Sequence, residues 1–189
     1  NLNAFYMLKH HKLIEKTIES NLMFDGVLLK VYKDHALMPD GNYSTREWIK
    51  HPGACAVVPV FDNGDVMLVQ QFRYGAKQVF IEVPAGKIDR GESPDSTAVR
   101  ELEEEVGLRC SSLIYLGHQY PAIGFSDEIL HNYLAIGLIN VPDNRDHDEF
   151  VEKLRVPLSQ ALEWVYDGTI IDAKSMIAII MADRKIRAL

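Results

Sequence analysis

The sequence predicts an α/β protein in which a mixed β-sheet is sandwiched between α-helices (α/β/α), preceded by an N-terminal antiparallel β appendage. Three observations support this fold class. Short alternating strand-like segments fill the chain before residue 51, further strand-like runs surround one helical segment between residues 53 and 140, and two amphipathic helical segments close the chain. Such an order of elements packs as a sheet with helical layers on its faces. The 189 residues, 47% of them hydrophobic, suffice for a substantial core.

Residues 7–50 are expected to form the β appendage, with turns at Asp25-Gly26 and Asp40-Gly41. A few strands alone are marginally stable, so the appendage must pack on something. Burial against a second subunit in a two-fold homodimer is the simplest solution, and packing only on its own domain is the alternative. The strand-like segments are LIEKTIESN, VLLKVYKDHAL and YSTREWIK, and the apolar positions include Ile14, Ile18, Val27, Leu29 and Val31. Residues 1–6, which precede Met7 without a clear pattern, are interpreted as a candidate cloning remnant.

Residues 51–189 are expected to form the main domain. Two of its strand-like runs flank Asn63-Gly64, which is a strong β-hairpin signal. The strand-like runs are ACAVVPVF, DVMLVQQFR, VFIEVPAG, LIYLGHQYP and EILHNYLAIGLI, and the closing helical runs are PLSQALEWVYDG and DAKSMIAIIMADRKIRA.

The composition narrows the class of protein. The formal net charge of −7 disfavours nonspecific nucleic-acid binding, which depends on basic patches. No apolar run is long enough to cross a bilayer, and the N-terminus lacks the order of a signal peptide. Cys55 and Cys110, in segments interpreted as a buried strand and a turn after a helix, are expected to be reduced thiols. We therefore expect a cytoplasmic protein that binds neither nucleic acid nor membrane.

Carboxylates gather at the end of the helix predicted over 94–106. Ser93 is a good N-cap, Pro94 suits the first helical position, and Gly107 suits the C-terminal cap. The spacing of the acids puts three of them on one face, and two carboxylates about 6 Å apart repel by roughly 3 kcal/mol at an effective dielectric of about 20. A divalent cation such as Mg²⁺ or Mn²⁺ would relieve this repulsion, whereas the alternative is a solvated charged face. The three acids are Glu101, Glu104 and Glu105, with Glu103 in the same turn.

The segment from Gly86 to Leu108 resembles the Nudix box. Every fixed position of that pattern is filled, by Gly86, Glu92, Arg100, Glu101, Leu102, Glu104, Glu105, Gly107 and Leu108. The resemblance implies the α/β/α Nudix fold and hydrolysis of nucleoside diphosphates linked to another group, with a divalent metal as cofactor. It also implies that Glu101 and Glu105 are the principal metal ligands, that Glu104 assists, and that Ala85 binds the metal through its carbonyl oxygen.

Outside the box, the resemblance narrows to the ADP-ribose and nucleoside diphosphate sugar pyrophosphatase branch, in which ADP-ribose yields AMP and ribose 5-phosphate. Near Pro121 the branch more usually has Ser-Pro-Gly than Pro-Ala-Ile-Gly, so GDP-mannose or another nucleotide sugar is an alternative substrate. A non-catalytic nucleotide-sensing module is an alternative of another class. The segments that carry the resemblance are STREWIKHPGACAVVPV, LVQQFRYG, FIEVPAGKID and YPAIGFSDEILHNYLA.

Several residues outside the box are candidates for binding the substrate. Arg73, at the end of a predicted strand, could clamp a phosphate or form a surface ion pair. By resemblance to the branch, Arg46 and Glu47 would reach the partner subunit's nucleotide, whereas by themselves they read as an exposed pair. Trp48 or Phe125 could stack on a base or belong to the core. Ser126, Asp127 and Glu128 could bind the sugar or cap a turn.

The general base is expected in the acidic segment DNRDHDEFVEK. By resemblance to the branch, Glu149 is the first choice, as base and as a further metal ligand, with Asp146 and Asp148 as alternatives. An exposed loop without a catalytic role is the other interpretation. His51, His131 and His147 do not have the spacing of zinc ligands and are expected to be structural or solvated.

Overall fold

The computed structural model describes residues 11–142 and 150–189, which form two compact units. The first unit contains the described residues up to His51 together with Ala122–Asp127. The second unit contains Pro52–Pro121 and Glu128–Leu189. The sequence predicts the division after residue 50; the compact units divide after His51, and Ala122–Asp127 also belongs to the first unit.

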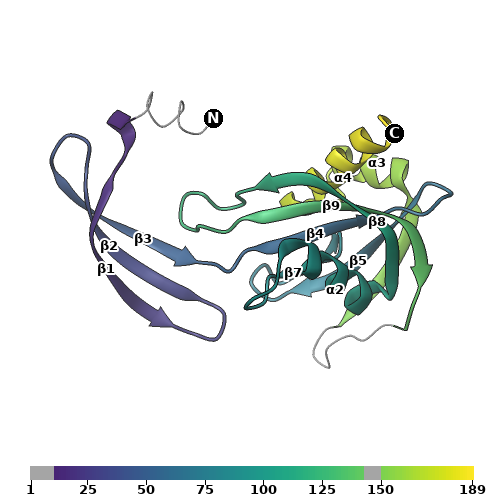
Figure 1. Ribbon diagram of the computed structural model, residues 1–189, viewed down its shortest axis with the longest axis horizontal. Helices are drawn as coiled ribbons and strands as arrows, with labels where there is room; N and C mark the ends of the chain where they lie inside the picture. The colour runs from purple at the N-terminus through teal and green to yellow at the C-terminus, as the bar shows by residue number, and fades with distance from the viewer. Residues whose placement is uncertain (1–10, 143–149) are drawn as a thin grey trace. The chain divides into compact units, whose positions relative to one another are not determined.

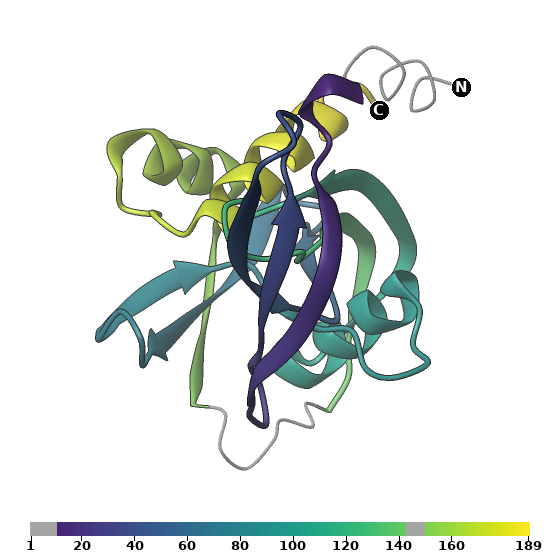
Figure 2. The same cartoon turned by 90° about the vertical axis from the view of Figure 1, so that its left-hand side faces the viewer.

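The first unit is an antiparallel sheet of three adjacent strands in the order β1-β2-β3 (Figure 2). The strands are β1 (Lys16–Asp25), β2 (Lys30–Leu37) and β3 (Tyr43–Lys50), preceded by the 3₁₀ turn η1 (His11–Leu13). The turns at Asp25-Gly26 and Asp40-Gly41 connect these strands, as predicted. Every residue of β1 is exposed in the single chain, so the expected alternation of burial is absent there.

The second unit is built on a mixed sheet in the order β7-β4-β9-β8 (Figure 1). Only the β4–β9 pair in this sheet is parallel. A smaller antiparallel sheet has the order β10-β5-β6. The strands are β4 (Ala54–Pro59), β5 (Asp65–Arg73), β6 (Gln78–Glu82), β7 (Ala85–Lys87), β8 (Leu108–Gln119), β9 (Leu130–Asn140) and β10 (Val151–Pro157).

Helices cover both faces of the mixed sheet. Helix α2 (Pro94–Val106) lies on one face, and α4 (Ala173–Ile186), with α3 (Leu158–Asp167) packed against it, lies on the other (Figure 1). Strand β4 is buried on both faces for this reason: Ala56 and Val58 join the core beneath α3 and α4, whereas Cys55 and Val57 join the core beneath α2. The predicted α/β/α arrangement is confirmed. Among the described residues, no helix has the length and apolar character needed to span a membrane.

The turn predicted at Asn63-Gly64 forms, but the strands on its two sides do not pair as a continuous β-hairpin. The tight turn forms, with Gly64 N donating to Phe61 O over 2.9 Å, and one isolated bridge joins Val60 to Val66. Strands β4 and β5 then separate into different sheets, because β7 and β9 already occupy both edges of β4. Cys110 was also misplaced: it lies in β8 and not in a turn, although both cysteines are free thiols as expected.

Candidate active site

Helix α2 begins and ends where the local sequence predicts. The Ser93 side chain accepts a hydrogen bond from Ser96 N over 3.2 Å, which satisfies one of the free donors of the first turn. Pro94 occupies the first helical position. Gly107 ends the helix in the left-handed conformation, with φ 66° and ψ 42°, and its N–H bonds to Glu103 O.

The acids in the last turns of α2 divide between two sides of the helix. Glu101 and Glu105 are buried, with 7% and 3% of their surface exposed, and they face the sheet. Glu104 is partly exposed. Glu103 lies on the outer side, where Arg109 donates two hydrogen bonds to its carboxylate at 2.6 and 2.9 Å. The structure therefore separates Glu103, an ordinary ion-pair partner, from the three acids that were predicted to share a face.

Arg100 relieves much of the repulsion among these acids. Its Nη1 donates to Glu101 Oε1 at 2.7 Å and to Glu104 Oε2 at 2.8 Å, while its Nε donates to Glu92 Oε1 at 3.0 Å. The hydrogen bonds from Arg100 and from the Thr97 hydroxyl lower the pKa of Glu92 to about 2. Arg100 therefore stabilises the cluster in addition to any bound cation.

Strand β7 brings backbone groups to the buried acids. Val57 N donates to Pro84 O, so Ala56 and Ala85 form the non-hydrogen-bonded pair of this antiparallel ladder. The N–H and C=O of Ala85 therefore face the open edge of β7, where the N–H donates to Glu105 Oε2 over 3.1 Å. The carbonyl oxygen of Ala85 faces the same edge, which fits its predicted role as a ligand.

The donor set suits a hard divalent cation. The oxygens of Glu101, Glu104 and Glu105 and the carbonyl of Ala85 are the ligand types that Mg²⁺ and Mn²⁺ prefer. Within residues 11–142 and 150–189, no group of three His, Cys, Asp or Glu side chains is arranged to hold a metal ion. Glu101 and Glu104 are instead directed at Arg100, so both would have to turn from its guanidinium to bind a metal.

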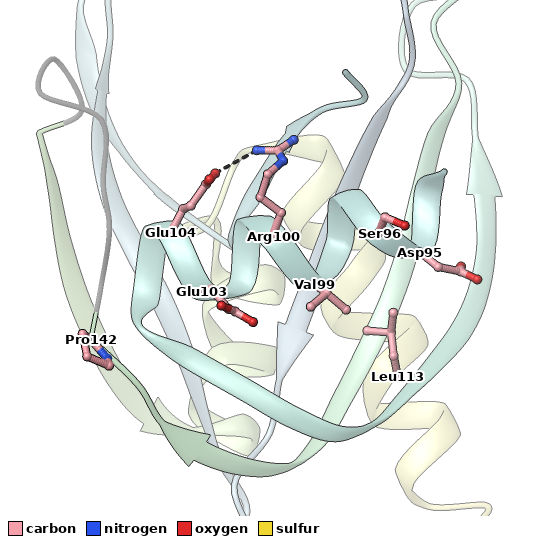
Figure 3. A pocket seen from close by; sticks show the side chains of 8 residues that line it. All are labelled: Asp95, Ser96, Val99, Arg100, Glu103, Glu104, Leu113 and Pro142. Carbon is pink, nitrogen blue, oxygen red and sulfur yellow. Dashed lines mark hydrogen bonds and ion pairs between the residues drawn. The ribbon is translucent and has the colours of Figure 1, made fainter. Parts of the chain in front are cut away.

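A cavity of about 600 Å³ lies on the outer side of α2 (Figure 3). Figure 3 shows Leu113 of β8 facing Val99, and Glu104 turned toward Arg100. Glu104 and its hydrogen-bond partner Arg100 both line the cavity, and Pro142 lies at one end of it. The remaining lining residues are Asp95, Ser96 and Glu103.

Arg73 is already bound to a carboxylate. Its Nε and Nη2 donate to Glu82 Oε1 and Oε2 at 2.7 and 2.6 Å, in bidentate geometry. Glu82 is 2% exposed and also pairs with Lys174, which in turn bonds to Asp172 over 2.7 Å. Burial raises the pKa of Glu82, but the hydrogen bonds and charges of Arg73 and Lys174 outweigh it, so the net shift is downward. The ion pair considered from the sequence exists, though its partner is buried.

The comparisons with known proteins agree with this geometry. The model of the NUDIX domain matches residues 50–176. The chain belongs to the Nudix family.

Among the relatives that match over most of their length are two proteins from Bacillus species. The ADP-ribose pyrophosphatase of Bacillus subtilis (strain 168) is 43% identical over 169 residues, which cover 88% of this chain and 91% of that protein. The methanol dehydrogenase activator of Bacillus methanolicus is 38% identical, with coverage of 87% and 90%. A crystal structure described as an ADP compounds hydrolase matches with a TM-score of 0.82 at 21% identity, covering 93% of this chain and 96% of that chain. The chain is therefore a Nudix hydrolase with the Nudix fold.

Candidate substrate residues outside the Nudix box lie mostly in the first unit. Arg46 pairs with Glu15 through Nε and Nη2 at 2.8 and 2.7 Å. Glu47 lies opposite Lys33 in the register of the sheet, and the ion pair of Arg46 is made with Glu15 rather than with its sequence neighbour Glu47. The reason is geometric, because neighbouring residues of a strand point to opposite faces.

Most of the aromatic and polar candidates contact neighbouring groups of the protein. Trp48 stacks on Tyr32 with ring centroids 4.9 Å apart, and its Nε1 donates to Asp34 Oδ2 at 3.0 Å. Phe125 is 58% exposed. Ser126 bridges to Ile49, Asp127 accepts a hydrogen bond from His51 N at 2.7 Å, and Glu128 belongs to the second unit. Asp127 thus joins its segment to the backbone that follows β3, 76 residues away along the chain.

The predicted base Glu149 lies outside the described residues, as do Asp146, Asp148 and His147. The residues that the sequence analysis missed are Glu82 and Lys174. An acid within the apolar run FIEVPAG was a signal for a buried ion pair, because a carboxylate is rarely buried without a partner. The partner on α4 could not be identified without the tertiary structure.

Proposed function

We propose that this Nudix hydrolase cleaves the pyrophosphate bond of ADP-ribose or a related nucleoside diphosphate sugar, giving a nucleoside monophosphate and a sugar phosphate. The observation that carries the proposal is that two buried acids of α2 lie against β7: Glu105 accepts a hydrogen bond from Ala85 N, and the Glu101 carboxylate lies against Gly86. The similarity to an ADP-ribose pyrophosphatase over nearly the whole length supports this choice of substrate.

Glu101, Glu105 and the Ala85 carbonyl would hold Mg²⁺, or Mn²⁺, with Glu104 assisting and Glu149 as a further ligand. The bound cation would lower the pKa of a coordinated water and offset the negative charge of the diphosphate. Arg100 holds Glu101 and Glu104 beside each other by hydrogen bonds, and it would release both carboxylates when the cation binds. Glu149 would accept a proton from the attacking water.

Arg73 would bind the diphosphate of the substrate. The Arg73 side chain is 44% exposed while its guanidinium binds Glu82, so Arg73 contacts both solvent and a buried anion. Lys174 also neutralises Glu82, so Arg73 could turn to a phosphate without leaving that buried carboxylate unpaired. Because Lys174 provides a second positive charge beside Glu82, Arg73 is available as a phosphate ligand.

The first unit would complete the enzyme as part of a homodimer. Along β1, Ile18, Leu22 and Phe24 are 59%, 46% and 57% exposed, and covering such a surface with a second subunit is favourable. Arg46, Glu47, Phe125, Ser126 and Asp127 would then contribute to substrate binding. Light scattering at micromolar protein tests this part, and a fully active monomer would contradict it.

The substrate is tested with a panel that contains ADP-ribose, GDP-mannose and other nucleotide sugars in the presence of Mg²⁺. We expect ADP-ribose to give the highest kcat/KM, measured by the released phosphomonoester. A preference for GDP-mannose would support the alternative hydrolase. Nucleotide binding without turnover across the panel would instead support a nucleotide-sensing module.

A second candidate function follows from the similarity to a methanol dehydrogenase activator. If this chain also acts as such an activator, its addition should raise the rate of a purified methanol dehydrogenase. The Glu105→Gln variant separates the two functions: a hydrolytic activation is lost in that variant, whereas activation through binding alone is retained.

A further inference from the structure

A β-bulge in β8 gathers three side chains that could bind a metal on one face of the mixed sheet. The pairing of β8 with β9 shifts between Tyr115 and Gly117, so Tyr115 lies opposite Tyr133 and His118 lies opposite His131. In a regular strand, residues 115 and 118 would point to opposite faces, but the extra residue brings them to the same face. Gly117 accommodates the irregular backbone with φ 131°.

The donor atoms of these side chains converge. His118 Nδ1 lies 3.1 Å and His131 Nδ1 lies 3.4 Å from the hydroxyl oxygen of Tyr115. The two imidazole rings have centroids 5.9 Å apart. Ligands about 2.0–2.1 Å from a tetrahedral Zn²⁺ lie about 3.3 Å from one another, so these separations match adjacent corners of such a site.

The cluster is reachable from solvent and lies apart from the box acids. Tyr115 is 49% exposed, His118 is exposed and His131 is half-buried. Tyr133 in the same row donates a 2.6 Å hydrogen bond to Asp95 in the first turn of α2. At 1.5 Å per residue, that turn is about 15 Å along the helix from Glu105.

The chemistry of the cluster favours a different metal from the one expected at the box. Imidazole nitrogens suit Zn²⁺, Cu²⁺ and Ni²⁺, whereas Mg²⁺ prefers oxygen ligands. The ring nitrogens of His118 and His131 therefore suit an ion of this class better than Mg²⁺.

We propose that His118 and His131, with the Tyr115 hydroxyl at a third position, bind one transition-metal ion of the Zn²⁺ class, at a site separate from the acids of the Nudix box. The expectation that His131 lacks zinc-ligand spacing considered only distances along the chain. Strand pairing overrides it, because His118 and His131 are directly opposite each other.

The test is a calorimetric titration of the full chain with Zn²⁺, in excess Mg²⁺ so that the acids of the box are occupied. We expect one Zn²⁺ per chain at this site, with the affinity reduced by about tenfold or more in His118→Gln and in His131→Gln, since each variant loses one of two imidazole ligands. Glutamine can still hydrogen-bond to Tyr115, so these variants should retain the native circular dichroism spectrum. His35→Gln, at an exposed histidine of β2, is the control and should bind Zn²⁺ like the wild type.

A second readout is the visible spectrum with Co²⁺ in place of Zn²⁺. Intense d–d bands are expected in the wild type and should be lost in the double variant His118→Gln/His131→Gln. Unchanged Zn²⁺ affinity and unchanged Co²⁺ bands in that folded double variant would overturn the proposal. So would a wild-type titration without any Zn²⁺ binding, which would leave the cluster as a hydrogen-bonded triad only.

Discussion

The carboxylate of Glu101 lies in the space that a side chain at Gly86 would need. A Cβ atom built on Gly86 would be 1.8 Å from Glu101 Oε1 and 2.1 Å from Glu101 Cδ. Gly86 is not among the glycines with positive φ. Space, and not a left-handed backbone, therefore requires glycine at this position of the box. The close approach ties strand β7 to the rotamer of a predicted metal ligand.

The variant Gly86→Ala should displace that carboxylate and lower kcat/KM by about 10²-fold, because misplacing a catalytic group by roughly 1 Å has effects of this size. Steady-state kinetics at saturating Mg²⁺ measure the loss. Gly75→Ala is the matched control, since nothing lies within 4 Å of its Cβ position. Equal activity of the two variants would contradict the importance of this close approach.

The variant Glu105→Gln keeps the shape of the side chain but removes a ligand charge. We expect turnover to fall by roughly 10²-fold or more, with a larger deficit at limiting Mg²⁺. Glu103→Gln is the control, because Glu103 pairs with Arg109 on the outer side of the same helix turn. Near-normal turnover of Glu105→Gln at limiting Mg²⁺ would show that Glu105 is not a ligand.

The variant Glu149→Gln should slow the chemical step by about 10²–10⁴-fold if this residue is the general base. Single-turnover kinetics separate that step from product release. Asp146→Asn and Asp148→Asn are the comparisons. If one of these two variants is the inactive one, the choice of Glu149 within the acidic segment is wrong.

The variant Lys174→Met leaves the buried Glu82 with Arg73 as its remaining cation. Removing one partner of a buried carboxylate should lower the free energy of unfolding by about 1–3 kcal/mol, measured by chemical denaturation. KM for the nucleotide sugar should rise while kcat changes little, because Arg73 is then bound more firmly to Glu82. Lys50→Met, at an exposed lysine, should change neither quantity. A lowered stability with unaltered KM would limit Lys174 to a structural role.

The dependence of stability on pH should reflect Glu92. Its pKa in the folded chain is lowered from 4.5 to about 2, so its contribution is fully present above about pH 4.5 and is lost as the pH falls through about 2. The wild type should therefore exceed Glu92→Gln in stability above pH 4.5, and the difference should shrink between pH 4.5 and 2. Thermal unfolding across this range measures it, and a constant difference would contradict the assignment.

The sequence alone determined the elements whose causes are local. The bounds of α2 follow from Ser93, Pro94 and Gly107, which act on the backbone within a few residues. The positions of Glu101 and Glu105 on one face follow from the helical period. The two closing helices and the turns of the β appendage were predictable for the same reason, because capping, periodicity and turn chemistry require no distant partner.

The tertiary structure alone decided which residues meet across long stretches of chain. Glu82 finds Lys174 only because α4 returns to the end of β6, and β4 leaves β5 because β7 and β9 fill both of its edges. The bulge that turns Tyr115 and His118 to one face depends on the register of β8 against β9. Register and long-range pairing are set by the packing of whole sheets, which no local sequence pattern contains.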